Sequence, residues 1–125
     1  MPPGDTKTRT WTWSRALGGV VPPMISPLSL TGEVDASALT ATVGHILDGE
    51  CSGLFVLGGC GEGAWLTREQ RSAVIRGAAR AAGGRAPVLA GVMMAATGPA
   101  AEAARRAADD GVDALVVGSP YYFSV

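Results

Sequence analysis

Residues 53–70, GLFVLGGCGEGAWLTREQ, decide the fold. The run from Leu54 to Leu57 is apolar throughout, which is typical of a strand that is buried on both faces. A glycine-rich turn follows at 58–63, and Thr67 with Gln70 then forms the capping-box pattern that starts a helix. The stretch therefore predicts a buried strand, a tight turn and a helix, in the order expected of a parallel α/β sheet.

Three helices are expected, each with a start signal and a glycine at its end. Asp35 and Thr67 carry side chains that can accept the first N–H groups, and Pro99 suits the first turn of a helix. The first helix is expected at 36–48, between Asp35 and a left-handed Gly49. The second is expected at 68–82, between Thr67 and Gly83-Gly84. The third is opened by Thr97-Gly98-Pro99, covers 100–110 and ends at Gly111.

Four parallel strands are expected in chain order, near 19–26, 54–58, 87–92 and 114–118, although prolines are unusual in a central strand such as the first. The β-α-β-α-β-α-β order fits the first half of a (β/α)8 barrel, which needs about 250 residues, or an open doubly wound sheet. The chain ends shortly after the last strand without a helix to cover it, which favours the partial barrel. We therefore expect an N-terminal arm at 1–17 and barrel strands 1 to 4 within 18–125.

The composition excludes several classes of function. Ten Lys and Arg against eleven Asp and Glu give a net charge of -1, so no basic face for nucleic acid is expected. The apolar runs are far shorter than the roughly 20 residues that span a bilayer, so no membrane partner is expected. Two cysteines, Cys51 and Cys60, are too few for a disulfide framework and indicate reduced thiols in a cytoplasmic protein. The only lysine is Lys7, in an arm that we interpret as a surface arm or a cap over an apolar end.

In parallel α/β folds, chemistry lies where the strands end. The segments expected to converge there are Ser26-Pro27, Gly58 to Glu62, Met93 to Thr97 and Ser119 to Tyr122. The glycine-rich turn either presents N–H groups to an anion or is a tight turn without a ligand. It is neither a P-loop nor a dinucleotide fingerprint, and the sequence predicts no cofactor and no metal site.

The side chains at these ends each allow two interpretations. Cys60 is a nucleophile or a small residue in a tight turn, and the lone His45, in a helix, offers no evident base. Glu62 is a general base or a structural carboxylate that accepts hydrogen bonds from turn N–H groups. Tyr121 and Tyr122 suit hydrogen bonding or a proton relay, or else packing.

Three motifs, taken in order, resemble those of a known family: Ile25-Ser26-Pro27-Leu28, Gly58-Gly59-Cys60-Gly61-Glu62 and Ser119-Pro120-Tyr121-Tyr122. From Gly19 to Tyr122 the chain resembles the N-terminal part of the dihydrodipicolinate synthase / N-acetylneuraminate lyase family. These proteins are Schiff-base aldolases and lyases on a (β/α)8 barrel, and the likeness covers about the first half of a member. The resemblance therefore implies a lyase or aldolase that acts on pyruvate or a related 2-oxo acid.

The resemblance also implies roles for residues. Gly59 and Cys60 occupy the positions of two hydroxyl residues that hold the substrate carboxylate, so the N–H donors are kept and the hydroxyls are not. Tyr122 matches a relay tyrosine that in the synthases reaches across a dimer interface. Ser26, Gly58, Gly61, Glu62 and Tyr121 are expected to support this site. Phe123 stands where the synthases often carry Asn, so the motifs do not select one substrate within the family.

The family forms its imine on a lysine after the sixth strand, which lies beyond these residues, and Lys7 does not match it. The expectation is a truncated member that is inactive alone and that forms a homo-oligomer or pairs with a complementary chain. The alternatives are a non-catalytic half-barrel that needs a partner and a small open-sheet anion-binding protein. Measured size separates these two, because an open sheet is expected to be monomeric.

Overall fold

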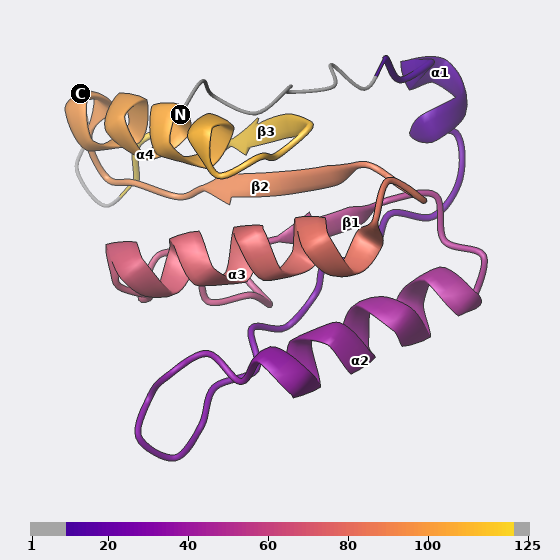
Figure 1. Ribbon diagram of the computed structural model, residues 1–125. Helices are drawn as coiled ribbons and strands as arrows, with labels where there is room; N and C mark the ends of the chain where they lie inside the picture. Colours follow the sequence, from indigo (N-terminus) through magenta and orange to yellow (C-terminus); the bar gives the residue numbers. More distant parts are fainter. Residues whose placement is uncertain (1–9, 122–125) are drawn as a thin grey trace, which may run out of the picture.

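The structure, a computed structural model, describes residues 10–121. Within this range, three strands form one parallel sheet in chain order, β1 (Leu54–Val56), β2 (Val88–Val92) and β3 (Ala114–Val117) (Figure 1). Phe55 pairs with Leu89, and Leu89 pairs with Ala114. The parallel order predicted for the last three strands is therefore confirmed.

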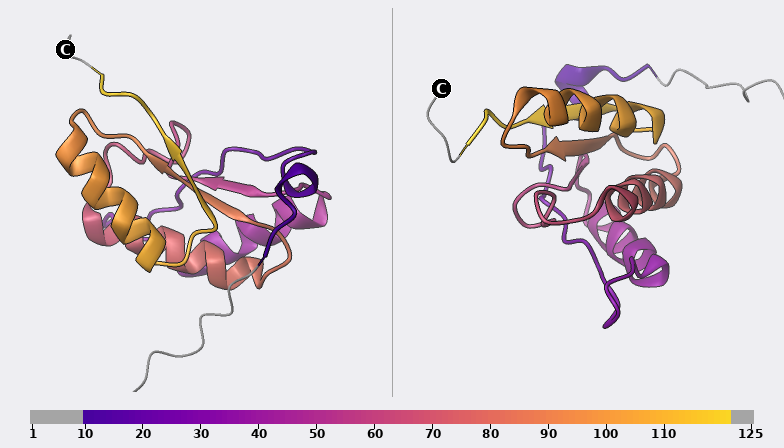
Figure 2. Two further views of the ribbon diagram at one scale, coloured as in Figure 1. Left: turned by 90° about the horizontal axis from the view of Figure 1, so that it is seen from above. Right: turned by 90° about the vertical axis from the view of Figure 1, so that its left-hand side faces the viewer.

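Three long helices connect and flank the strands: α2 (Ala36–Asp48), α3 (Arg68–Ala82) and α4 (Thr97–Asp109). All three lie on the same side of the sheet, and the views of Figure 2 agree on this arrangement. The core fills the layer between them, with buried side chains such as Leu39 from α2, Val74 from α3 and Val88 from the sheet. The loops that build the site follow the carboxyl ends of the strands.

The boundaries of α2 and α3 follow the predicted caps, with one exception, whereas α4 begins at Thr97 and ends at Asp109, not at 100 and 110. Asp35 accepts hydrogen bonds from the N–H groups of Ser37 and Ala38, and these bonds lower the pKa of its carboxyl group, the bond from Ala38 most strongly. Thr67 forms the predicted capping box with Gln70. The prediction that Gly49 adopts a left-handed conformation is wrong, because its φ is -80°. The left-handed residue is the next one, Glu50, with φ 59°. The chain thus reverses one residue later than expected.

The predicted first strand at 19–26 is also wrong as a regular strand. The segment runs parallel to β1, but only Pro23 forms a bridge, with Phe55. The N–H of Met24 donates to the carbonyl of Phe55 at 2.8 Å, and the N–H of Phe55 donates to the carbonyl of Pro22 at 3.2 Å. Pro22 and Pro23 have no N–H to donate, so a continuous ladder cannot form there.

A one-turn helix, α1 (Trp13–Ala16), lies in the N-terminal arm. The indole N–H of Trp11 donates to Asp113 Oδ1 at 2.8 Å, and Asp113 Oδ2 accepts from the N–H of Val88 at 2.9 Å. The arm is therefore tied to the starts of β2 and β3, as a cap would be. The boundary between arm and barrel at residues 17 and 18 stays a prediction, and Lys7 lies outside the described residues.

The strand β3 is an edge of the sheet and carries exposed apolar side chains. Leu115 pairs with Ala90 and Val117 with Val92, so each pair shares a face of the sheet. Ala90 and Val92 are buried, whereas Leu115 is 37% exposed and Val117 is 61% exposed. The helices thus cover the middle of the sheet and leave this edge open.

Candidate active site

The glycine-rich turn after β1 is held in shape by close backbone contacts. A Cβ atom at Gly63 would lie 1.9 Å from the carbonyl oxygen of Leu57, and one at Gly61 would lie 2.7 Å from the Leu57 nitrogen. No side chain fits at these distances, so both positions require glycine. The N–H groups of Glu62 and Gly63 donate within the turn, to the carbonyls of Gly59 and Gly58.

Ser26 fastens this turn from a distant part of the chain. Its hydroxyl donates to the carbonyl of Gly61 at 2.7 Å, and the side chain is buried, with the residue only 8% exposed. The carbonyl oxygen of Met24 lies close by, 2.9 Å from where a Cβ of Gly61 would stand. The structure therefore brings together two of the segments that were expected to converge.

Gly59 and Cys60 form the open part of the same turn. No atom outside the adjoining residues lies within 4 Å of the position of a Cβ at Gly59, and Cys60 is exposed with a free thiol. Within residues 10–121, the N–H groups of Gly59 and Cys60 donate to no acceptor. These two donors are thus available to an anion, which the role predicted for them requires.

A hollow of about 410 Å³ lies beside this turn, and we call it the glycine-turn hollow. Met93 from the end of β2 and Tyr121 from the segment after β3 close its other side, and the Tyr121 hydroxyl donates to the Met93 carbonyl at 3.4 Å. Three strand ends therefore meet around one space. The lining residues are Gly58, Gly59, Glu62, Gly63, Ala64, Trp65, Met93 and Tyr121.

The sequence did not single out Trp65, which is 82% exposed on the wall of the hollow. Its only signal was an aromatic residue between a glycine-rich turn and a helix cap. Exposed aromatic side chains at a hollow are suited to contact a ligand or a partner.

The Glu62 carboxylate does not make the hydrogen bonds that its structural interpretation describes. Its side chain accepts no hydrogen bond from the described turn, and the backbone carbonyl of Glu62 instead accepts from the N–H groups of Trp65 and Leu66. The backbone of Glu62 is left-handed, with a φ of 54°. Glu62 nevertheless lines the hollow, where the role of a general base stays a prediction.

Several predicted features lie elsewhere or cannot be placed. His45 lies in α2, away from the lining of the hollow. Tyr122 and Phe123 lie outside the described residues. Within the described range, no group of three or more His, Cys, Asp or Glu residues is placed to hold a metal ion. None of the helices there combines the length and the apolar character that crossing a bilayer requires.

Comparison with known protein sequences finds relatives of this chain. The sequence profile of the dihydrodipicolinate synthetase family matches residues 16–125. A 4-hydroxy-tetrahydrodipicolinate synthase from Phenylobacterium zucineum is 38% identical over 104 residues, which is 83% of this chain and 35% of that protein. The chain spans about a third of the length of the curated relatives it matches.

Solved structures agree with the sequence comparison. YagE from Escherichia coli K12, described as a member of the dihydrodipicolinic acid synthase family in complex with pyruvate, aligns with a TM-score of 0.81 at 32% identity, over 86% of this chain and 36% of that one. The dihydrodipicolinate synthase of Aquifex aeolicus aligns with a TM-score of 0.78 at 35% identity, over 83% and 35% of the two chains. The predicted parallel α/β fold, which corresponds to part of a larger barrel, is confirmed.

Proposed function

Because the chain belongs to the dihydrodipicolinate synthetase family, we propose that it supplies the carboxylate-binding part of an active site for pyruvate or a related 2-oxo acid. The reaction is that of a lyase or aldolase that works through a Schiff base. The observation that carries the proposal is the pair of available N–H groups at Gly59 and Cys60, beside a hollow closed by Tyr121.

The turn binds a carboxylate through its backbone. Two N–H groups without an internal acceptor are suited to the two oxygens of a carboxylate, and bonds from N–H groups to an ionised acceptor are stronger than neutral ones. Ser26 fixes the turn through Gly61, so the donors are positioned before a ligand arrives. The keto group of the substrate then extends into the glycine-turn hollow.

The imine-forming lysine is supplied, in this proposal, by sequence outside these 125 residues. Residues 10–121 contain no lysine, and an amine that forms an imine needs a dry pocket that lowers its pKa. The amine attacks the keto carbon, and the carbonyl oxygen leaves as water after proton transfer. We assign that proton transfer to Tyr122, on the strength of the family motif alone.

A second candidate is a non-catalytic half-barrel that requires a partner. The exposed Leu115 and Val117 on the edge strand β3 favour association with a second copy or with a complementary chain. Sedimentation of the isolated chain tests this candidate, because a monomer of 12.6 kDa that unfolds cooperatively would contradict it. The proposal also places the protein in the cytoplasm, where its two free cysteines stay reduced.

The test of the catalytic proposal is borohydride reduction in the presence of pyruvate, followed by peptide mass mapping. The chain alone is expected to give no stoichiometric adduct. Mixed with the C-terminal part of the Phenylobacterium zucineum synthase, and shown by sedimentation to bind it, it is expected to restore an adduct on the lysine of that part. An adduct on Lys7 that a competing 2-oxo acid removes, or an associated pair without any adduct, would overturn the proposal.

Gly59 offers a test of the carboxylate site itself. A Cβ at Gly59 meets no atom within 4 Å, so Gly59→Thr introduces a hydroxyl at an open position of the turn. In the associated pair we expect turnover to rise by about 10²-fold, at the low end of what a positioned proton donor contributes. Gly98→Thr is the matched control, because a Cβ at Gly98 also meets no atom within 4 Å, on α4 and outside the hollow. Equal rates for the two variants would argue against a role for this turn in the reaction.

A further inference from the structure

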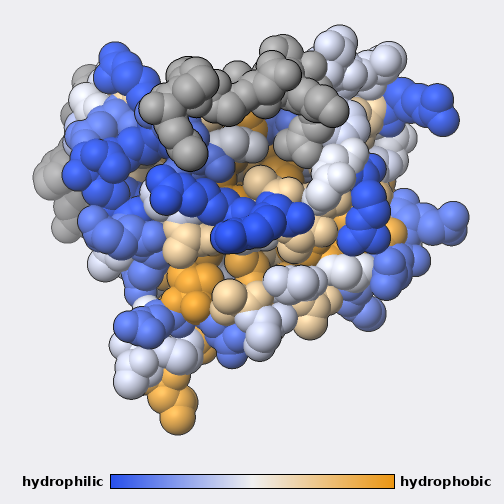
Figure 3. All heavy atoms as spheres, in the orientation of Figure 1, coloured by the Kyte–Doolittle hydropathy of each residue, from blue (hydrophilic) through white to orange (hydrophobic). Residues whose placement is uncertain are grey.

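A second hollow, of about 370 Å³, lies between α3 and α4, and we call it the arginine hollow. It shares no lining residue with the glycine-turn hollow. Figure 3 shows a band of hydrophilic side chains across this face, flanked by apolar ones. The lining residues are Arg68, Arg71, Met94, Pro99, Glu102, Ala103 and Arg106.

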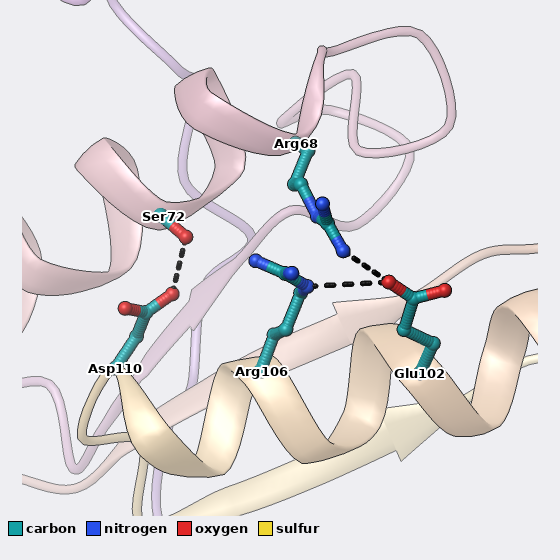
Figure 4. A network of polar contacts seen from close by, with 5 residues as sticks. All are labelled: Arg68, Ser72, Glu102, Arg106 and Asp110. Atoms are coloured by element: carbon teal, nitrogen blue, oxygen red, sulfur yellow. Dashed lines mark hydrogen bonds and ion pairs between the residues drawn. The ribbon is translucent and has the colours of Figure 1, made fainter.

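The charges that line the arginine hollow do not balance. Three guanidinium groups face a single carboxylate, that of Glu102, which leaves a net formal charge of +2. Arg68 from α3 and Arg106 from α4 both point at the same oxygen of Glu102, as Figure 4 shows. One carboxylate is therefore shared by two cations.

Arg71 forms no ion pair with a carboxylate within residues 10–121. Its guanidinium donates to the backbone carbonyl of Leu66 at 3.1 Å. Burial, and then the nearby charge of Arg68, lower the pKa of the Arg71 side chain. A partly buried cation that faces another cation is costly, and an anion in the hollow would relieve this cost.

Two further acids, Glu69 and Asp110, lie near these arginines but outside the lining of the hollow, and the charge of Glu69 only partly offsets the lowered pKa of Arg71. Asp110 accepts a hydrogen bond from Ser72 (Figure 4). It also pairs with Arg76, so both of its oxygens are engaged. It lines a neighbouring cavity together with Arg68, Arg71 and Arg106, and does not line the arginine hollow itself. Because its two oxygens are bound by Ser72 and Arg76, it forms no ion pair with Arg71.

The start of α4 adds a further feature suited to an anion. Its N-cap residue, Ala96, has no side chain that can accept a hydrogen bond, and the first turn holds no acidic residue. The free N–H groups and the helix dipole at this end favour negative charge, and Pro99 of this first turn lines the hollow. The arginines and this helix end thus favour the same kind of ligand.

We propose that the arginine hollow binds a small oxyanion with two negative charges, held by Arg68, Arg71 and Arg106. The planar guanidinium group matches the oxygens of a phosphate or a carboxylate in pairs. A charge of -2 balances the lining. The site is independent of the proposed 2-oxo acid site, because pyruvate carries one negative charge and the two hollows have no residue in common.

The probe is inorganic phosphate, with succinate as the second arm, measured by equilibrium dialysis of the full chain at constant ionic strength. If phosphate binds and succinate does not, the ligand carries a phosphate group, and the reverse result indicates a dicarboxylate. Arg71→Gln is expected to weaken binding of the preferred probe at least about tenfold, because a hydrogen bond to a charged group is lost. Arg80→Gln is the matched control, since Arg80 lies on the same helix and outside the hollow.

A third variant separates binding from folding. Glu102→Gln removes the only negative side chain of the lining, so binding of the probe is expected to strengthen several-fold, an effect that a merely damaged fold would not produce. Far-ultraviolet circular dichroism confirms that each variant is folded. Absence of binding for both probes, equal weakening by Arg71→Gln and Arg80→Gln, or weaker binding by Glu102→Gln would overturn the proposal.

Discussion

Removal of the Ser26 hydroxyl is expected to destabilise the fold and loosen the glycine-rich turn. In Ser26→Ala, the carbonyl of Gly61 loses the bond of 2.7 Å that it accepts. Ser26 is 8% exposed, so water has little access to replace this donor. Leaving a buried polar group without a partner costs about 1–3 kcal/mol. With a urea dependence of about 2 kcal/mol per molar for a domain of this size, the midpoint of unfolding falls by about 1 M.

The assay is urea unfolding followed by tryptophan fluorescence. Ser29→Ala is the control, because Ser29 is exposed and its hydroxyl bonds Thr31 and the N–H of Glu33 within its own loop. Surface substitutions of this kind change stability by no more than about 0.5 kcal/mol. If Ser26→Ala and Ser29→Ala shift the midpoint equally, the Ser26–Gly61 bond does not hold the turn, and the preorganised donors at Gly59 and Cys60 lose their support.

Two further predictions concern the helices. Gly44→Ala in α2 is expected to stabilise the fold by about 0.5–1 kcal/mol, because a Cβ there meets no atom within 4 Å. Gly77→Ala in α3 is expected to destabilise the fold, because its Cβ would lie 2.3 Å from Leu39 Cδ2. Thermal melts measure the sign of both changes, and a stabilising Gly77→Ala would refute the packing described for α2 and α3. Asp35→Ala is expected to lower stability at neutral pH, since the ionised carboxylate caps α2. The pKa of Asp35 is lowered from 3.8 in the folded state, so this contribution is present above that value and is lost as the pH falls through the lower folded pKa. Melting curves of wild type and Asp35→Ala should converge in that acid range. The control is Glu33→Gln, which should change stability little because the exposed Glu33 side chain forms no hydrogen bond or ion pair within residues 10–121.

Features that depend on neighbours in the sequence were predictable. The capping box at Thr67 and the cap at Asp35 each need only a side chain and an N–H group two or three residues away, and both were placed correctly. The apolar runs located β1, β2 and β3. The absence of alternation matches the burial of β2 on both faces, whereas β3 lies at the edge and is partly exposed. The motifs then indicated the family, which the match over residues 16–125 shows.

Features that depend on exact backbone geometry or on tertiary contacts were not predictable. The segment before α2 looked like a strand, yet Pro22 and Pro23 cannot donate to a ladder. The left-handed backbone of Glu62, and the bonds that its carbonyl accepts from Trp65 and Leu66, were not foreseen from the sequence. The arginine hollow exists only because α3 and α4 lie side by side, and no spacing in the sequence brings Arg71 and Arg106 together.

The bond between Trp11 and Asp113 has a consequence for the order of folding. It joins residues 102 apart in the sequence, so closing it early would restrict almost the whole described chain. Asp113 also receives the N–H of Val88, so its position depends on the pairing of β2 with β3. The arm is therefore expected to dock last, after the parallel strands have assembled, and the indole of Trp11 becomes a natural reporter of the final kinetic step. The same hydrogen bond would be the first to break when the edge strand β3 leaves β2 and pairs with another strand.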